Sequence, residues 1–293
     1  MHDGQTEVIA AQVQALLAAQ MPDLAALPLK RVGLTGTDNV LYRLGTGLVG
    51  RFPRLLHAEA QISTQAQWLP RLAEALPLAV PLTQRLGLPG AGYPYRWTVL
   101  PWLPGHAAFA GPLDQMEAAQ TLAGFLQILQ AQPRPHGCPQ RGEADRLGHR
   151  FASLGHFIGQ FEGEADPLIL AKVAAEMRRL PAHSGDPLWV HGDLHPLNLL
   201  ALGRRLTGVI DWGGLGLGDP ATDLMVGWTL LDAPARRVFH DALRPSPEAW
   251  ARGRALAFAK AVAAIPYYRR SNPGFRGVML RTLTRVLQDL SAA

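Results

Sequence analysis

The stretch that decides the fold runs from Val190 to Leu224 and reads VHGDLHPLNLLALGRRLTGVIDWGGLGLGDPATDL. Within it, the polar turn Gly-Arg-Arg separates two apolar segments, 197–202 and 206–210. Apolar runs of strand length on both sides of a glycine-bearing turn predict a β-hairpin. Because the two ends of a hairpin lie side by side, the sequence is expected to bring Asn198 close to Asp211.

A third polar side chain comes just before this hairpin. An apolar run ends in His-Gly-Asp, a tight turn that leaves the carboxylate of Asp193 at a strand end. Asn198 and Asp211 offer two hard oxygen ligands, and Asp193 offers a separate carboxylate base. Such a set on a rigid scaffold is suited to Mg²⁺-dependent phosphoryl transfer. Asp193 is therefore the candidate catalytic residue, and Asn198 and Asp211 are the candidate metal ligands.

The same residues resemble kinase motifs. Residues 191–194 (HGDL) followed by Asn198 resemble the catalytic loop H-R-D-L-x-x-x-N, with glycine in place of arginine, and residues 211–213 (DWG) resemble D-F-G. The wording H-G-D-L-H-P-x-N, then I-D-W and G-D-P-x-x-D-L, is similar to the aminoglycoside phosphotransferase family of small-molecule kinases. The resemblance implies an α+β, two-lobed protein-kinase-like fold. Its small antiparallel β lobe would span residues 1–103, and its larger, mainly helical lobe would span 104–293.

The spacing of apolar residues predicts most of the remaining elements. Strands are expected at 40–44, 48–52, 84–87 and 96–100. Helices are expected at 7–19, 57–76, 113–131, 143–161, 167–180, 220–231, 233–243, 247–265 and 275–290.

By resemblance, the small lobe binds the nucleotide. The loop before the first of these strands contains Gly36, Thr37 and Asn39, and it is expected to fold over the phosphates with backbone N–H groups as donors. The kinase pattern also requires a cation on the next strand, where no lysine is present. Arg51 takes that place, with Arg54 as a substitute, and a guanidinium can bind phosphate with two hydrogen bonds.

Two further parts of the nucleotide site follow from the resemblance. The pattern places a glutamate on the next helix to orient the strand cation; Glu59 is the candidate, although Gln65 lies where the family acid is expected. A proline-rich stretch resembles the kinase hinge, with Leu100, Trp102 and Leu103 lining the adenine pocket. Because the proline before Trp102 lacks an N–H, Trp102 or Leu103 is the expected donor to adenine.

The implied reaction is transfer of the γ-phosphate of ATP, or GTP, with Mg²⁺, to a hydroxyl of an antibiotic or a metabolite alcohol. Only a short connection separates Asp211 from Pro220, whereas a protein kinase needs a long activation segment there to dock a polypeptide. A small-molecule acceptor is therefore expected. The many arginines from residue 233 onward disfavour a polycationic aminoglycoside.

Two other classes of function stay open at this point. The missing strand lysine would also suit a catalytically weak, kinase-like nucleotide-binding protein. Alternatively, the alternate residues His191, Asp193 and His195 could share one strand face and hold the metal of a hydrolase. Pro196 disfavours a continuing strand, and this alternative leaves Asn198 and Asp211 unexplained.

The overall composition excludes several classes of protein. The 293 residues are 48% apolar and 17% charged, which does not suggest disorder, and the single cysteine, Cys138, cannot form an intramolecular disulfide. The net charge is +5, but the arginines are scattered or paired and only three lysines are present, so no nucleic-acid partner is expected. Without a leader-like N-terminus or a long apolar span, we expect no membrane and a cytoplasmic location. The oligomeric state stays open.

Overall fold

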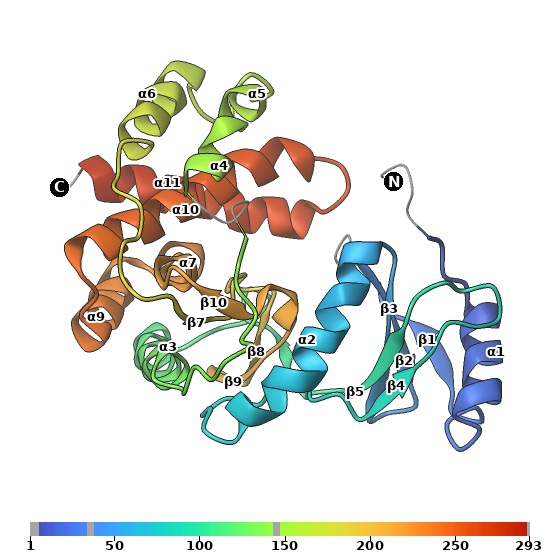
Figure 1. Ribbon diagram of the computed structural model, residues 1–293. Coiled ribbons are helices and arrows are strands. Elements are labelled where there is room, and N and C mark those ends of the chain that lie inside the picture. Colours follow the sequence, from blue (N-terminus) through green and yellow to red (C-terminus); the bar gives the residue numbers. More distant parts are fainter. Residues whose placement is uncertain (1–5, 34–37, 143–146, 292–293) are drawn as a thin grey trace. The chain divides into compact units, whose positions relative to one another are not determined.

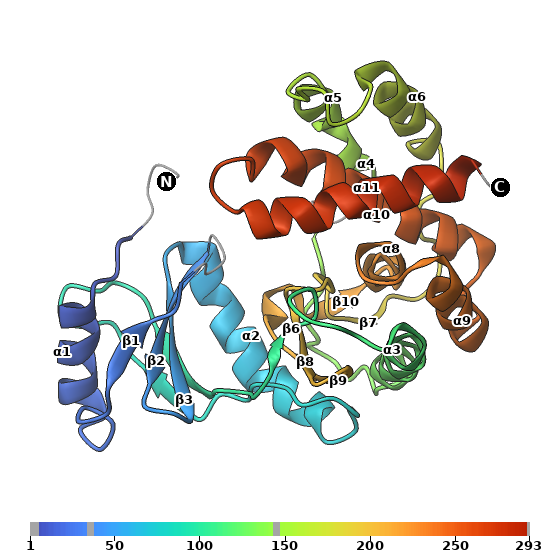
Figure 2. The same ribbon diagram turned by 180° about the vertical axis from the view of Figure 1, so that it is seen from behind.

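The computed structural model describes residues 6–33, 38–142 and 147–291. The chain forms two compact units (Figures 1 and 2). Unit 1 comprises Met1–Glu74 and Ala79–Pro104, and unit 2 comprises Ala75–Leu78 and Gly105–Ala293. Two expected nucleotide-binding residues, Gly36 and Thr37, lie outside the described residues.

Unit 1 is built on an antiparallel sheet with the strand order β1-β2-β3-β5-β4. The strands are β1 (Leu29–Arg31), β2 (Asn39–Leu44), β3 (Leu48–Pro53), β4 (Arg85–Gly87) and β5 (Trp97–Pro101). The sheet lies between helices α1 (Ala10–Gln20) and α2 (Leu56–Ala73) (Figures 1 and 2). The predicted strands and both predicted helices are confirmed to within a few residues, whereas β1 is too short for its sequence to reveal.

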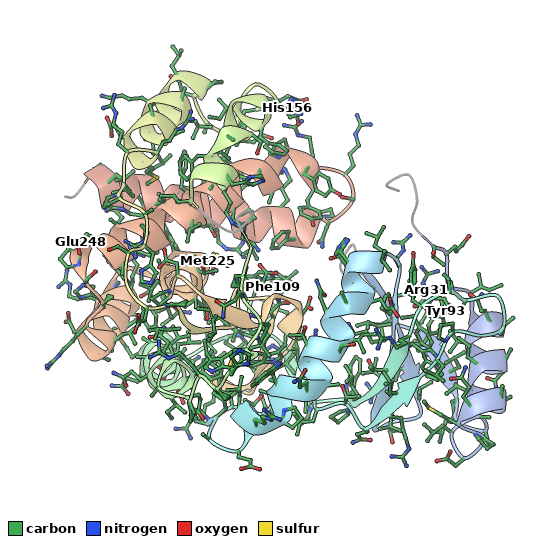
Figure 3. The ribbon with its side chains drawn as sticks, viewed as in Figure 1. Arg31, Tyr93, Phe109, His156, Met225 and Glu248 are labelled. Carbon is green, nitrogen blue, oxygen red and sulfur yellow. The ribbon has the colours of Figure 1, made fainter. Side chains whose placement is uncertain are left out.

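Aromatic packing fixes the position of β3 in unit 1. Phe52 stacks on Trp97 with a centroid separation of 5.0 Å, and Tyr42 and Tyr93 meet Phe52 edge-on. The Tyr93 hydroxyl donates to the carbonyl of Pro53 at 2.6 Å, and burial raises the pKa of this phenol (Figure 3). Packing of Phe52 thus fixes β3 within the sheet, and the neighbouring residue Arg51 points to the opposite face.

Unit 2 is mainly helical. Its helices are α3 (Gln115–Gln130), α4 (Leu147–Ala152), α5 (Leu154–Ile158), α6 (Pro167–Met177), α7 (Ala221–Leu224), α8 (Val226–Thr229), α9 (Ala233–Leu243), α10 (Pro247–Tyr267) and α11 (Pro273–Ser291). Helix α10 forms the centre of the core, with 13 buried residues, and α11 runs along it (Figures 1 and 2). Among the described residues, none of the helices is long and apolar enough to cross a membrane.

Two of the predicted helices are interrupted in the structure. The expected helix 220–231 is split at Met225 into α7 and α8, and at the start of α7 the N–H groups of Thr222 and Asp223 bond the carbonyls three residues earlier. These i→i+3 bonds tighten the chain into short turns. The expected helix 143–161 becomes α4 and α5, with Ser153 between them, and residues 143–146 are not described.

Two small sheets complete unit 2. The predicted hairpin is confirmed: β8 (Leu199–Leu202) pairs with β9 (Arg205–Val209), and β6 (His106–Ala107) lies on the other side of β8. The second sheet pairs β7 (Leu188–Val190) with β10 (Gly216–Gly218). The Gly-Leu-Gly sequence of β10 has little strand propensity, so only this pairing identifies it.

A partly buried carboxylate clamps the turn between α10 and α11. Glu164, in the loop before α6, accepts hydrogen bonds from Arg269 at 2.9 Å and from Arg276 at 2.8 Å. Its side chain is only 10% exposed. Burial raises the pKa of the Glu164 carboxyl, but the hydrogen bonds, chiefly from Arg269, outweigh burial and lower this pKa to about 2.

This clamp makes a testable contribution to stability. Because the folded-state pKa of Glu164 lies below its unfolded value, its contribution is present above pH 4.5 and lost as the pH falls toward about 2. We expect Glu164→Gln to lower the free energy of unfolding at pH 7 by up to about 3 kcal/mol, with the difference from the parent vanishing at low pH. Urea unfolding from pH 2 to 7 measures this difference.

Glu162 provides the matched control for this clamp. It pairs with the same Arg269 at 2.9 Å, but its side chain is 72% exposed. Glu162→Gln should therefore change the free energy of unfolding by less than about 1 kcal/mol at any pH. Equal effects of the two substitutions would contradict the assignment of the clamp to Glu164.

Candidate active site

The β8–β9 hairpin gathers the three residues expected to carry the chemistry in unit 2. The Asn198 side-chain amide donates to the backbone carbonyl of Asp193 at 2.9 Å. The Asn198 carbonyl accepts from the N–H of Ile210 at 2.9 Å, and Asp211 is the next residue. Asn198 therefore contacts Asp193 through its side chain, and its backbone pairs with the residue that precedes Asp211, as the predicted hairpin requires.

A buried carboxylate holds the turn that carries Asp193. Asp223, at the end of the G-D-P-x-x-D segment, is completely buried and accepts from the N–H of His191 at 2.7 Å and of Gly192 at 2.9 Å. Burial raises the pKa of Asp223, and these N–H groups oppose that rise. Each carboxylate oxygen holds one peptide group, so the turn has little freedom to change direction.

The glycine that replaces the arginine of H-R-D makes room for an arginine from elsewhere. Gly192 has φ +86°, and a Cβ there would meet the Arg141 guanidinium and the carbonyl oxygen of Gly214. Arg141 donates to the carbonyls of Gly214 and of Gly192, the latter at 3.4 Å. Its backbone N–H also bonds Leu217 of β10 at 2.9 Å. Arg141 thereby ties the turn that carries Asp193, here called the catalytic turn, to the segment that follows Asp211.

Both histidines of the motif are engaged through both ring nitrogens. The N–H of Asp193 donates to Nδ1 of His191 at 3.2 Å, so Nε2 carries the proton and donates to Ile210 at 3.0 Å. The N–H of Leu197 donates to Nδ1 of His195 at 3.3 Å, and Nε2 of His195 donates to the Asp193 carboxylate at 3.2 Å. Burial lowers the pKa of His195 below its usual value, so this ring is neutral at pH 7.

These tautomers argue against the metallohydrolase alternative. Each Nδ1 lone pair accepts a backbone N–H, and each Nε2 carries a proton, so neither ring presents a lone pair to a metal. Within the parts of the chain that the structure describes, no group of three or more His, Cys, Asp or Glu side chains could hold a metal ion. His191 is a structural support, with its ring 4.7 Å from that of the buried Trp212.

Asp193 has a partner that the sequence did not suggest. The Lys260 ammonium, from α10, forms an ion pair with Oδ1 of Asp193. Burial raises the pKa of Asp193, but Lys260 and His195 outweigh burial and hold it well below its usual range. The Asp193 side chain is 39% exposed and is ionised at neutral pH. Only one weak signal could have found Lys260: it is one of three lysines in a chain that otherwise uses arginine.

The residues predicted to bind metal suit Mg²⁺ by their chemistry. Asp211 has a left-handed backbone, with φ 59° and ψ 66°, which turns the chain sharply as it leaves β9. The Asp211 carboxylate is exposed. Among the described residues, no hydrogen-bond donor faces the side-chain oxygen of Asn198. Non-glycine residues in this conformation cluster at functional sites. Two hard oxygens suffice for an ion that keeps several waters.

In unit 1, Arg51 lies on β3 and is held by α2. The side chain is only 5% exposed, and it donates to the amide oxygens of Gln65 at 2.6 Å and of Gln61 at 3.3 Å. Gln65 therefore stands where a kinase has its glutamate. Because both amides are neutral, neither contributes a negative charge to balance the guanidinium. Arg54 lies beyond the end of β3, and its N–H bonds the carbonyl of Asp38.

The structure gives Glu59 a different partner from the expected one. Glu59 accepts from Nε of Arg96 at 2.9 Å and from the backbone N–H of Arg96 at 3.3 Å. This hydrogen bonding lowers the pKa of Glu59. Glu59 faces the chain entering β5, while Gln65, almost two turns further along α2, faces β3. Of the two candidates, Gln65 is thus the one hydrogen-bonded to Arg51.

The hinge-like stretch offers one adenine donor instead of two. The N–H of Trp102 already donates to the carbonyl of Gly47 at 2.8 Å, so this N–H is not available to adenine, while the lining of the pocket by Trp102 stays a prediction. Arg43 covers the Trp102 ring at 4.2 Å. Among the described residues, the N–H of Leu103 has no hydrogen-bond partner, which leaves it as the candidate donor. Leu100, on β5, is buried.

Of the three residues expected in the loop over the phosphates, Asn39 is the one that the structure describes. It begins β2, opposite Pro53, and its side-chain oxygen is buried without a hydrogen-bond partner among the described residues. A buried polar atom left unsatisfied is costly, so it calls for a ligand or water.

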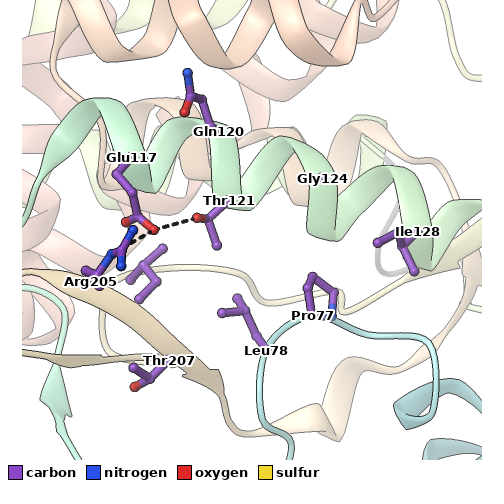
Figure 4. Close-up of a pocket in the computed structure, with 10 residues that line it drawn as sticks. Pro77, Leu78, Glu117, Gln120, Thr121, Gly124, Ile128, Arg205 and Thr207 are labelled. Carbon is purple, nitrogen blue, oxygen red and sulfur yellow. Dashed lines mark hydrogen bonds and ion pairs between the residues drawn. The ribbon is translucent and has the colours of Figure 1, made fainter.

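A larger pocket lies away from these residues (Figure 4). It has a volume of about 450 Å³ and is lined by α3, β9 and residues 77–78. Glu117 crosses one end, with Thr121 at 3.1 Å and Arg205 at 3.6 Å (Figure 4). None of the expected site residues lines it, so its size does not make it the active site. A narrower pocket opens at Asp193 and Lys260.

The family follows from comparison with known proteins. The model of the phosphotransferase enzyme family (APH) matches residues 30–256, and the chain belongs to that family. An aminoglycoside 3'-phosphotransferase from Escherichia coli is 28% identical over 128 residues, which are 40% of this chain and 45% of that protein. The match therefore spans just under half the length of this curated relative.

Solved structures show the same fold. The GDP and kanamycin complex of the phosphotransferase APH(2")-IIIa superposes with a TM-score of 0.72 at 19% identity, over 94% of this chain and 98% of that one. The macrolide 2'-phosphotransferase MphH from Brachybacterium faecium gives a TM-score of 0.59 at 19% identity, over 93% and 97%. The predicted kinase-like α+β fold is confirmed.

The Arg51–Gln65 contact leads to a prediction about nucleotide binding. A carboxylate at position 65 would neutralise the guanidinium and compete with phosphate for its donors. We expect Gln65→Glu to raise the Kd for Mg·ATP about tenfold, equivalent to about 1.4 kcal/mol. Titration calorimetry measures this change. Gln67→Glu, the same substitution at an exposed position of α2, should leave the Kd unchanged. An unaltered Kd in the Gln65 variant would exclude Arg51 as the phosphate-binding cation.

Gly192 leads to a prediction about the catalytic turn. Alanine there would meet both the Arg141 guanidinium and the carbonyl of Gly214, in addition to the backbone strain at positive φ. Gly163 is the control, because its φ is +97° and a Cβ at that position would have no atom within 4 Å. We expect Gly163→Ala to cost about 1–2 kcal/mol and Gly192→Ala clearly more. Urea unfolding compares them, and equal losses would show that Arg141 does not crowd the turn.

Proposed function

We propose that the protein transfers the γ-phosphate of ATP or GTP, with Mg²⁺, to a hydroxyl of a small molecule. The observation that carries the proposal is the proximity of Asp193, Asn198 and Asp211 at the β8–β9 hairpin, with the turn before Asp193 held by Asp223. Unit 1, expected over residues 1–103, would bind the nucleotide. Unit 2, expected over residues 104–293, would carry the catalytic groups and the acceptor.

Asp193 is positioned to orient the acceptor. Its carboxylate would accept a hydrogen bond from the hydroxyl whose oxygen attacks the γ-phosphorus. As the new P–O bond forms, the bond between the γ-phosphorus and the bridging oxygen breaks, and the nucleoside diphosphate leaves. The low pKa of Asp193 makes it a weak base. The hydroxyl proton therefore passes to Asp193 late, and orientation is the carboxylate's larger contribution.

Asn198 and Asp211 would hold the Mg²⁺ ion. Once bound, the ion supplies positive charge to the β- and γ-phosphate oxygens. In unit 1, Arg51 would bind the same phosphates through its guanidinium. Leu103 would donate its N–H to the base, with Leu100 beneath it, and the loop at Gly36, Thr37 and Asn39 would cover the phosphates.

The relatives support a small-molecule acceptor. Structures of similar proteins contain GDP with kanamycin, and ATP with streptomycin, and others are named macrolide 2'-phosphotransferases. The short connection from Asp211 to Pro220 supports a small acceptor here. We place the reaction in the cytoplasm, where Mg·ATP and Mg·GTP are supplied, with neither nucleic acid nor membrane as a partner.

The neutral partner of Arg51 favours one alternative, a kinase-like protein that binds nucleotide but transfers phosphate slowly. A screen of ADP and GDP release over aminoglycosides, macrolides and hydroxylated metabolites separates the two functions. Nucleotide binding without release for any acceptor would favour the alternative.

Asp193→Asn tests the assignment of the catalytic residue. The amide can no longer take the proton and orients the hydroxyl less well, so we expect kcat to fall about 10²- to 10⁴-fold with unchanged nucleotide affinity. Asp186→Asn is the control, because the Asp186 side chain is 85% exposed. Turnover of an identified acceptor by Asp193→Asn at the parent rate would exclude Asp193.

A further inference from the structure

We propose that Lys260 forms an anion-binding subsite beside Asp193, so that the acceptor carries a carboxylate or phosphate near its reacting hydroxyl. This inference rests on the proposed phosphotransferase function and specifies its substrate class. It makes Lys260 a specificity-determining residue for the acceptor.

The position of the Lys260 ammonium supports this role. It extends from α10 to Oδ1 of Asp193, while Oδ2 of Asp193 faces His195. Its side chain is 18% exposed, and its Nζ lies 6.0 Å from the centre of the Phe275 ring. Counting contacts among the described residues, only one of its three N–H groups has an acceptor. The other two N–H groups remain available to an oxyanion.

Lys260 also shares a pocket with Asp193, the residue proposed to orient the acceptor. Asp193 and Lys260 line one narrow pocket together with Thr222, Met225 and Leu256 (Met225 is labelled in Figure 3). Arg150 lines the same pocket. A hydroxyl bound to Asp193 would therefore have an ammonium within reach of its neighbouring substituent. A carboxylate or phosphate there forms a charge-assisted hydrogen bond, whereas an ammonium group is repelled.

The surrounding helices reinforce the preference for a negative charge. Residues 247–291, which include α10 and α11, contain eight lysine or arginine residues and two acidic ones. Apart from Asp193, which pairs with Lys260, three carboxylates in or beside this region are already paired with arginines. These pairs are Asp219 with Arg252, Asp289 with Arg236 and Arg254, and Glu164 with Arg269 and Arg276. A polycationic acceptor would have to compete with an arginine for each of these three carboxylates.

Matched two-carbon probes test the subsite without knowledge of the natural acceptor. Glycolate, ethylene glycol and ethanolamine share a hydroxyl and carry charges of −1, 0 and +1. Their effect on the Tm is measured for the protein saturated with Mg²⁺ and β,γ-methylene-ATP. We expect glycolate to raise the Tm most and ethanolamine least. Lys260→Met should abolish the advantage of glycolate, and Lys260→Glu should reverse the order.

Lys172→Met is the matched control, because Lys172 lies exposed on α6 and should leave the order unchanged. The inference is overturned if glycolate has no advantage in the parent, or if it keeps that advantage in Lys260→Met. It is also overturned if Lys260→Met mainly weakens nucleotide affinity, because the ammonium would then serve the γ-phosphate.

The same samples separate this inference from the proposed function. If the parent binds neither Mg·β,γ-methylene-ATP nor Mg·β,γ-methylene-GTP, the phosphotransferase function fails, and the probe order is read on the nucleotide-free protein. If the parent binds nucleotide and phosphorylates a polycation faster than a hydroxy acid, only the anion subsite fails.

Discussion

The candidate active site depends on one buried carboxylate. Asp223 lies at 0% exposure and binds the two peptide N–H groups that begin the catalytic turn, one with each oxygen. Removing it would leave two buried donors unsatisfied, which is more costly than losing an exposed hydrogen bond. With the turn fixed, the directions of Asp193 and of the His191 ring follow, and Asn198 then packs against the same backbone.

The parts of the site that the sequence predicts are those that local geometry determines. The hairpin needs only two apolar runs and a glycine turn, and its pairing places Asn198 near Asp211 without information from the rest of the chain. Long helices such as α10 and α11 are predictable because an apolar face that repeats with helical spacing over many residues fits no strand or loop. Short elements such as β1 and β10 carry too few residues for a pattern, and only their partners reveal them.

The parts that could not be predicted depend on contacts between distant segments. Lys260 is 67 residues from Asp193, and Arg141 is 51 residues from Gly192. Neither spacing is periodic, so nothing in the sequence pairs them. The choice between Glu59 and Gln65 is different, since both lie on α2. It depends on which face of the helix meets β3, and the competing ion pair with Arg96 becomes visible only when β5 is in place.

Two contacts, of Gln65 with Arg51 and of Lys260 with Asp193, change the charge around these residues. In unit 1, a neutral glutamine stands where the kinase pattern places a carboxylate, so the side chain at position 65 adds no negative charge beside Arg51. In unit 2, Lys260 gives a positive neighbour to a carboxylate that would otherwise attract cations. Both changes favour negatively charged ligands. A fold shared with aminoglycoside phosphotransferases is thereby compatible with an anionic acceptor, because the catalytic turn is held by Asp223 and not by the residues that contact the acceptor.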